Sequence, residues 1–436
     1  MTVCNTKSIT FARVKRREVE AKFSASTVTS DGGIMLLSAA DKELRLLEEV
    51  SRVIPDTRDP LKVEHSVLTM LRQRVYGIAI GNEDLNDHTT LRNDLAWQAA
   101  IGQDSQMASA STLCRFENRM ERETAIKIHN IVIDKFIGTH KVAPKELVLD
   151  FDSTDNPIHG MQEGRFFHKY YKGYCFLPLY VTCGDWVLVS YLRRSNRDGA
   201  RHATTIASLL VRKLRQVWPH VKIVIRGDGG FCRRILMHWC ERNNVKYILG
   251  LPKNNVLIKT IASQLEAAKS QYDKSKEKQR LFTSFEYAAK TWKTKRSVVA
   301  KAEHGSQGAN PRFIVTNLDG EAQSLYDDVY CARGNMENRI KEQIEMFSAR
   351  TSCHEWWPNQ LRLLLSNLAY TLMLRIRTKG LAGTELARAQ VGTIRLKLLK
   401  VGAVIISNTR RVVFLLSSSF PYQDIFAKAA ARLQAT

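Results

Sequence analysis

Apolar residues recur along this chain with two different spacings. In the first third they recur every three or four positions, for example in residues 36–47 and 67–78, and this spacing predicts helices. Beyond it, short β-branched runs alternate with amphipathic helical stretches, in the order β-β-β-α-β-α-β. That order predicts a mixed sheet with flanking helices, an α/β fold of the ribonuclease-H-like kind. We therefore expect a helical N-terminal region over residues 1–138 and an α/β domain over residues 139–378.

The α/β domain has a predicted interruption at about residues 253–312. Within it, alternating runs at 281–287 and 296–300 predict β hairpins, so we interpret it as a β-rich insertion. Residues 379–436 form a basic C-terminal region. The remaining elements that we predict for the α/β domain are strands over 146–152, 174–181, 186–192, 221–226, 246–251 and 313–318, and helices over 204–217, 235–243 and 335–376.

Charge narrows the class of partner. The 436 residues include 66 Lys or Arg against 43 Asp or Glu, a formal net charge of +23. Such an excess favours a polyanion, because each neutralised phosphate releases counterions. The insertion is basic as well, with twelve Lys or Arg against four acids between residues 253 and 301. Nucleic acid is therefore the predicted partner.

The remaining composition excludes several other classes of protein. An apolar fraction of 44% is too high for a disordered chain. The eight cysteines contain no C-x-x-C pair, which argues against a zinc site and a disulfide framework and favours a reduced, cytoplasmic environment. No apolar stretch approaches the length of a membrane span, so we expect no membrane partner. With the charge, this predicts a nucleoid-associated protein.

Carboxylates stand at the ends of two predicted strands and near the start of a predicted helix. Asp150 and Asp152 alternate on one face of their strand, and Asp228 follows another strand between two glycines. Glu337 lies at the start of a helix. Hard cations such as Mg²⁺ need carboxylates gathered at one point, and two strand ends and a helix can provide this. Taken one at a time, each acid is equally typical of an ordinary turn or a surface ion pair.

The helix that carries Glu337 has further polar residues at regular spacing. Tyr330, Arg333, Glu337 and Lys341 are three, four and four positions apart, which places them on one helix face or its approach. The pattern fits a metal ligand beside phosphate-binding groups. It equally fits a ladder of salt bridges on a solvated face.

Two further residues are candidates for DNA binding. A helix that begins near Ser111 would expose Arg115, and a short helix entered in this way can read a groove, as in helix-turn-helix proteins. The alternative is a structural helix in a bundle. Trp292, in the insertion, would stack on a base drawn out of the duplex. The alternative is a tryptophan packed against its own hairpin.

Together, these motifs resemble the DDE transposases of bacterial insertion sequences, in the branch with a Y-x-x-R-x-x-x-E motif. The chain is similar in particular to the insertion-sequence family numbered thirteen-eighty. The resemblance runs from about residue 24 to the C-terminus. The matching stretches are residues 150–154 (DFDST), 227–231 (GDGGF) and 333–342 (RGNMENRIKE).

The resemblance implies a fold, an activity and a set of roles. It implies a ribonuclease-H-like core with a β insertion, two Mg²⁺ ions with Mn²⁺ as a substitute, and cut-and-paste transposition. The partners would be the terminal inverted repeats and target DNA, bound by a homodimer. By the match, Asp152, Asp228 and Glu337 are the catalytic residues and metal ligands. Tyr330 and Arg333 would contact DNA phosphates.

The sequence departs from the wider family at one position and leaves two other functions open. Where the family has a lysine seven residues after the glutamate, this chain has Ile344, and we expect Lys341 to take that role. A nuclease or junction resolvase of the same fold would cut DNA without joining it. A DNA-binding protein without catalysis is the other alternative, and the intact set of three acids argues against it.

Overall fold

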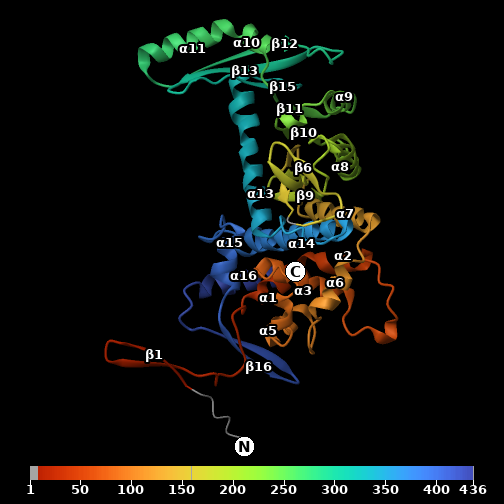
Figure 1. The fold of residues 1–436 in the computed structure, drawn as a ribbon, viewed down its shortest axis with the longest axis vertical. Coiled ribbons are helices and arrows are strands. Elements are labelled where there is room, and N and C mark those ends of the chain that lie inside the picture. Colours follow the sequence, from red (N-terminus) through yellow and green to blue (C-terminus); the bar gives the residue numbers. More distant parts are fainter. Residues whose placement is uncertain (1–7, 159, 436) are drawn as a thin grey trace, which may run out of the picture. The chain divides into compact units, whose positions relative to one another are not determined.

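The computed structural model describes residues 8–158 and 160–435, and they form two compact units. The first, here called the terminal unit, combines Met1–Ser51, Asp56–Phe116 and Leu372–Thr436, as far as these are described. The second, the sheet unit, combines Arg52–Pro55 with Glu117–Thr371. Both ends of the chain therefore belong to one unit, and the colours of Figure 1 show red and blue segments together there.

The terminal unit is mainly helical, as the N-terminal part of the sequence predicts. The helix predicted over 36–47 is two helices, because Arg45 has a left-handed backbone (φ 52°) that ends the first of them. The helices and strands that lie wholly in this unit are β1 (Ile9–Val14), β2 (Arg17–Ala21), β3 (Val28–Thr29), α1 (Ile34–Leu44), α3 (Val67–Ile80), α4 (Asp87–Leu91), α5 (Leu95–Ile101), α15 (Val391–Ile394), β16 (Ala403–Asn408), β17 (Arg411–Leu416) and α16 (Gln423–Gln434).

The basic C-terminal region completes the terminal unit. Strand β16 pairs antiparallel with β3 and also with β17, and α16 packs on α1. Asp31, which is 2% exposed, accepts hydrogen bonds from Trp97 Nε1 and Lys400 Nζ, each at 2.9 Å. One buried carboxylate thus joins side chains from distant parts of the sequence.

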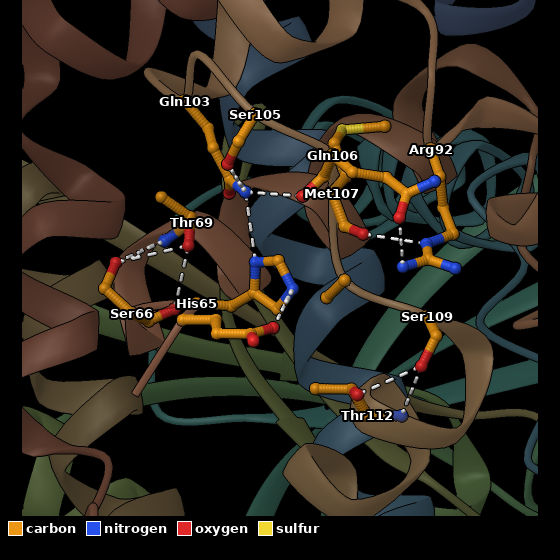
Figure 2. Close-up of polar contacts among 12 residues, drawn as sticks. His65, Ser66, Thr69, Arg92, Gln103, Ser105, Gln106, Met107, Ser109 and Thr112 are labelled. Carbon is orange, nitrogen blue, oxygen red and sulfur yellow. Dashed lines mark hydrogen bonds and ion pairs between the residues drawn. The ribbon is translucent and has the colours of Figure 1, made fainter. Parts of the chain in front are cut away.

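Side-chain hydrogen bonds fix the segment that leads into α6 (Ala110–Glu117). Arg92 Nε donates to the carbonyl oxygen of Met107 at 2.9 Å (Figure 2). The hydroxyl of Ser109 accepts from the backbone N–H of Thr112 at 3.3 Å, as Figure 2 also shows. A hydroxyl therefore caps this helix, as predicted, but two residues before its predicted start.

The sheet unit contains a nine-stranded mixed sheet. Its strand order is β12-β13-β15-β11-β10-β4-β8-β9, with β14 paired to β13. The five strands β9-β8-β4-β10-β11 have the order 3-2-1-4-5 in chain sequence, with β8 antiparallel to β4 and β10 parallel to it, which is the ribonuclease-H-like arrangement. The predicted α/β fold class is therefore confirmed. The strands are β4 (Glu146–Ser153), β8 (Leu179–Cys183), β9 (Trp186–Tyr191), β10 (Lys222–Gly227), β11 (Lys246–Leu251), β12 (Gln279–Tyr287), β13 (Arg296–Gly305), β14 (Gly308–Ala309) and β15 (Arg312–Thr316).

Two predicted elements of the α/β domain differ from those observed. The strand predicted over 174–181 is two strands, β7 (Gly173–Phe176) and β8, because Pro178 between them has no N–H to donate to a sheet. Strand β7 pairs instead with β5 (Asn156–Pro157) and β6 (Phe166–His168) in a small separate sheet. The helix predicted over 335–376 is likewise interrupted, into α13 (Gly334–Glu345) and α14 (Trp356–Arg375).

The insertion contains helices as well as the predicted strands. Helices α10 (Asn255–Thr260) and α11 (Ala262–Ser275) precede β12, and α11 packs against β12 and β13 (Figure 1). Strands β13 and β15 extend the main sheet beyond β11. The insertion is therefore continuous with the central sheet.

The two faces of the sheet have different roles. Leu147, Leu149 and Phe151 of β4 enter the main hydrophobic core, which α7 (Arg122–Gly138), α8 (Ala203–Val217) and α9 (Arg234–Arg242) complete. The alternate residues of β4, including Asp150 and Asp152, point to the other face, as the sequence predicts. In the described parts of the chain, no helix has the length and apolar character needed to cross a membrane.

The join between the two ends of the chain is testable through Asp31→Ala. Without this carboxylate, the indole N–H of Trp97 and the ammonium group of Lys400 lose their acceptor, so we expect the free energy of unfolding of the terminal unit to fall by about 2–4 kcal/mol. In hydrogen-exchange mass spectrometry, protection should fall in both α1 and β16, while β4 keeps its protection. Loss confined to one end would contradict the shared core. The exposed Glu64→Ala is the control and should change little.

Candidate active site

The pairing of β4 with β10 determines where two of the predicted acids lie. The strands run parallel, with Arg226 opposite Asp150 and Gly227 opposite Phe151. Asp228 follows β10 directly, so the same register brings it beside Asp152, at the C-terminal ends of both strands. The side chain of Asp228 accepts the N–H of Gly230 at 2.9 Å, which fixes one of its oxygens and turns the chain away from the sheet.

A buried arginine connects these strand ends to the segment that leads into α13. Arg226, which is 7% exposed, donates to both oxygens of Asp150, at 2.5 Å and 2.8 Å. Its remaining terminal nitrogen donates to the carbonyl oxygen of Val329 at 2.5 Å. Asp150 is therefore fully engaged in a structural ion pair and is only 4% exposed. Between the two acids of β4, this leaves Asp152 as the one directed at the site.

Arg333 joins two of the predicted acids. Its Nη1 donates to Oδ2 of Asp152 at 2.9 Å, and its Nη2 donates to Oε1 of Glu337 at 3.3 Å. Helix α13, which carries Glu337, packs on β8, and Arg339 anchors it by an ion pair with Asp185 at 2.7 Å. The sequence places the two acids far apart, and one guanidinium group brings their carboxylates together in the fold.

The electrostatics of Asp152 reflect its crowded position. Burial raises the pKa of this carboxyl to about 6, even though Arg333 and the N–H of Ser153 favour the charged form. The negative charges of Asp228 and Glu337 add to the rise, so both of these carboxylates act on Asp152. A metal cation bound to Asp152 would offset the repulsion that Asp228 and Glu337 exert on it, just as a proton does.

Three aromatic side chains of the β6–β7 hairpin form the wall of a pocket over the two aspartates. His168, Tyr170 and Tyr171 line a cavity of about 160 Å³ together with Asp152 and Asp228. The Nδ1 atom of His168 is buried and has no hydrogen-bond partner among the described residues. Burial raises the pKa of Tyr171 to about 12, with the charges of nearby acids adding to the effect. The sequence analysis missed these residues; the signal was the run of aromatic and basic residues just after the first acidic motif.

Tyr330 lies on a second, larger cavity, which Gly229, the residue after Asp228, also lines. This cavity of about 470 Å³ is also lined by Gly250, Lys253 and Arg312. A Cβ atom on Gly250 would lie 2.7 Å from the hydroxyl of Tyr330, so glycine is needed at this position. Burial raises the pKa of Tyr330, and Asp228 contributes to the rise. A neutral phenol beside two cations is suited to hydrogen-bonding a phosphate oxygen.

The remaining predicted site residues lie apart from the acids. Lys341 is exposed on α13, one turn beyond Glu337, whereas Glu342 is buried and ion-paired with Arg339 at 3.2 Å. Trp292 is half-buried between the ring of Tyr287 and the guanidinium group of Arg296.

Arg115 belongs to the terminal unit, where it is exposed. It donates to the hydroxyl of Thr112 within its own helix at 3.2 Å. This placement leaves the guanidinium group accessible at the surface.

The three acids have the donor chemistry of a magnesium site, but their side chains are not arranged as a metal cage. In residues 8–158 and 160–435, no three His, Cys, Asp or Glu side chains lie close enough to hold one ion. Arg333 instead provides the positive charge between Asp152 and Glu337. All-oxygen carboxylate ligands fit Mg²⁺ or Mn²⁺, and binding would require the guanidinium group to release at least one of them.

Comparisons with known proteins agree with this chemistry. No curated protein matches the chain. Among solved structures, the chain is similar to the piggyBac transposase in a cryo-EM synaptic complex with hairpin DNA. The two are 12% identical, with a TM-score of 0.41 over 86% of this chain and 83% of that one, a likeness too weak to carry an argument. Residues 11–436, nearly the whole chain, match the family described as transposase DDE domain group 1. The chain therefore belongs to the DDE transposase family.

Proposed function

We propose that this transposase cuts DNA at the terminal inverted repeats of an insertion sequence and joins the ends to target DNA, by cut-and-paste transposition that depends on divalent metal ions. The observation that carries the proposal is the meeting of Asp152, Asp228 and the Arg333–Glu337 pair at one edge of a ribonuclease-H-like sheet. Membership of the DDE transposase family supports it independently. The resemblance to the insertion-sequence family numbered thirteen-eighty belongs to the same proposal.

In this proposal the acids are the ligands of two Mg²⁺ or Mn²⁺ ions. Such ions activate the attacking water or hydroxyl and stabilise the leaving oxygen of a phosphodiester. The chain's own part is to place Asp152 and Asp228 side by side and to deliver Glu337 on α13. Arg333 holds the site together by neutralising acids that would otherwise repel one another. If Asp152 held a cation, the guanidinium group of Arg333 would be free to bind a DNA phosphate.

DNA binding is proposed for four places besides the acids. The cavity of Tyr330 offers Lys253 and Arg312 beside Asp228, and Lys341 lies exposed further along α13. Trp292 and Arg115 remain predicted DNA contacts in the insertion and the terminal unit. The net charge of +23 fits a protein that contacts long stretches of duplex, and we propose that two copies hold the two transposon ends.

A nuclease of the same fold is the alternative function. It would cleave the same DNA but would not transfer the 3′ end to a second duplex. An assay with labelled end DNA and a supercoiled target plasmid separates the two functions. Products joined to the plasmid are expected for a transposase, and cleavage without joined products would favour the nuclease.

Glu337→Gln is expected to abolish cleavage and leave binding to the end DNA nearly unchanged. The substitution keeps the size of the side chain but removes the charge that a metal ligand needs. Binding relies on lysines and arginines elsewhere, so its affinity should stay within about threefold, a change of less than 1 kcal/mol. Cleavage in Mg²⁺ and gel-shift affinity measure the two effects. Glu345→Gln, on the same helix, is the control and should cleave normally.

Asp150 and Asp152 are expected to respond in opposite ways to substitution by asparagine. Asp150→Asn leaves Arg226 buried without a full counter-charge, so the free energy of unfolding should fall by about 3–5 kcal/mol. Asp152→Asn should cost about 1 kcal/mol or less, because Arg333 keeps Glu337 and repulsion from Asp228 is removed. It should nevertheless abolish cleavage. Denaturant unfolding measures the stability of both variants, and the cleavage rate measures their activity. If Asp152→Asn were active, Asp150 would be the metal ligand instead.

A further inference from the structure

A third cavity of the sheet unit is surrounded by arginines. It has a volume of about 240 Å³ and lies between the loop that follows β9 and the start of α14. The residues that matter for its chemistry are Arg193, Arg194, Arg197, Arg201, His202 and Trp356. We call this set the arginine pocket. None of these residues belongs to a motif that the sequence analysis singled out.

The positive charge of the arginine pocket is only partly neutralised. Arg194 has one ion pair, with Glu163 at 3.5 Å. The nearest acid of the loop, Asp198, is paired outside the pocket with Arg233 at 2.9 Å. Within the described part of the chain, Arg197 and Arg201 are exposed and have no hydrogen-bond or ion-pair partner for their side chains.

The pKa of His202 also reflects an excess of positive charge in the pocket. Partial burial lowers the pKa of its imidazole, and Arg201, Arg193 and Arg122 lower it further. The ring therefore lies in a field that opposes a further cation. Like charges held this close cost free energy unless an anion lies among them. The geometry and the field together describe a site that attracts an anion.

The same loop forms part of the pocket over the aspartates. Gly199 lines the cavity of Asp152 and Asp228, and the buried Arg193 donates to its carbonyl oxygen at 2.6 Å. Arg193 also donates to the hydroxyl of Ser153 at 2.6 Å, the residue directly after Asp152. An anion in the arginine pocket would thus be held in fixed register with the end of β4.

We propose that the arginine pocket binds a backbone phosphate of the DNA strand that is being cut, a few nucleotides from the phosphate at Asp152. The inference rests on the proposed function. The phosphates of a DNA strand are regularly spaced, so one strand can place one phosphate at Asp152 and another in the arginine pocket. Arg197 and Arg201 supply unpaired guanidinium groups that match a phosphate's two free oxygens. The indole of Trp356, which already faces the guanidinium group of Arg194 at 5.7 Å, closes one side of the pocket.

Single uncharged phosphates test this proposal. End DNA is prepared with one methylphosphonate at each position in turn around the cut, and affinity is measured by gel shift without divalent metal. In the wild-type protein, we expect one or two adjacent positions to weaken binding roughly tenfold to hundredfold. In the Arg197→Gln/Arg201→Gln variant, unmodified DNA should bind more weakly by the same factor of roughly ten to a hundred. Methylphosphonates at the one or two sensitive positions should then weaken its binding no further.

Matched controls separate this proposal from its alternatives. Arg212→Gln/Arg242→Gln removes the same two charges from exposed positions on α8 and α9 and should keep the wild-type pattern of interference. If the double variant also keeps that pattern, the arginine pocket does not bind DNA and the proposal is overturned. It is also overturned if calorimetry shows inorganic phosphate binding to the wild-type protein but the double variant keeps the wild-type interference pattern, because the pocket would then bind only a free anion. Wild-type cleavage and joining of unmodified ends test the proposed function separately.

Discussion

The candidate active site depends on the buried side chain of Arg226. Its guanidinium group holds Asp150 on the neighbouring strand by two hydrogen bonds and the carbonyl oxygen of Val329 by a third. Three segments that are distant in the sequence are therefore joined at Asp150 and Arg226, each two residues before Asp152 or Asp228. A guanidinium group is suited to this because its planar donors point in fixed directions and its charge is permanent.

Arg333 plays the corresponding role at the surface of the same site. It is less buried than Arg226, and its two acceptors belong to acids that we propose as metal ligands. The two arginines differ in the role of the acids that they bind. Arg226 neutralises Asp150, which has a structural role, whereas Arg333 neutralises Asp152 and Glu337, which we propose as metal ligands. In the proposed function, the ion pair of Arg226 stays fixed, and Arg333 gives up at least one of its acids to a metal ion.

Hydrophobic spacing predicted most of the sheet unit. The alternation of Leu147, Leu149 and Phe151 with acids showed which face of β4 meets the core, and the order of strands and helices indicated the fold class. Spacing cannot show which strands pair, so the roles of Arg226 and Arg193 were not foreseen. Helices α10 and α11 were missed although Leu257, Ile261, Leu265 and Ala268 recur at helical spacing, because the alternating runs at 281–287 and 296–300 led to a β-rich interpretation of the whole insertion.

The shared core of the two chain ends has a consequence for biosynthesis. A ribosome releases the whole sheet unit before it releases β16 and α16, so that unit can fold while the terminal unit still lacks part of its core. Until then, α1 lacks its contact with α16, and β3 lacks its partner strand β16. A stop codon before β16 would therefore remove packing partners of α1 and β3 and leave the acids of the sheet in place. Residues translated late thus complete a core that residues translated early begin.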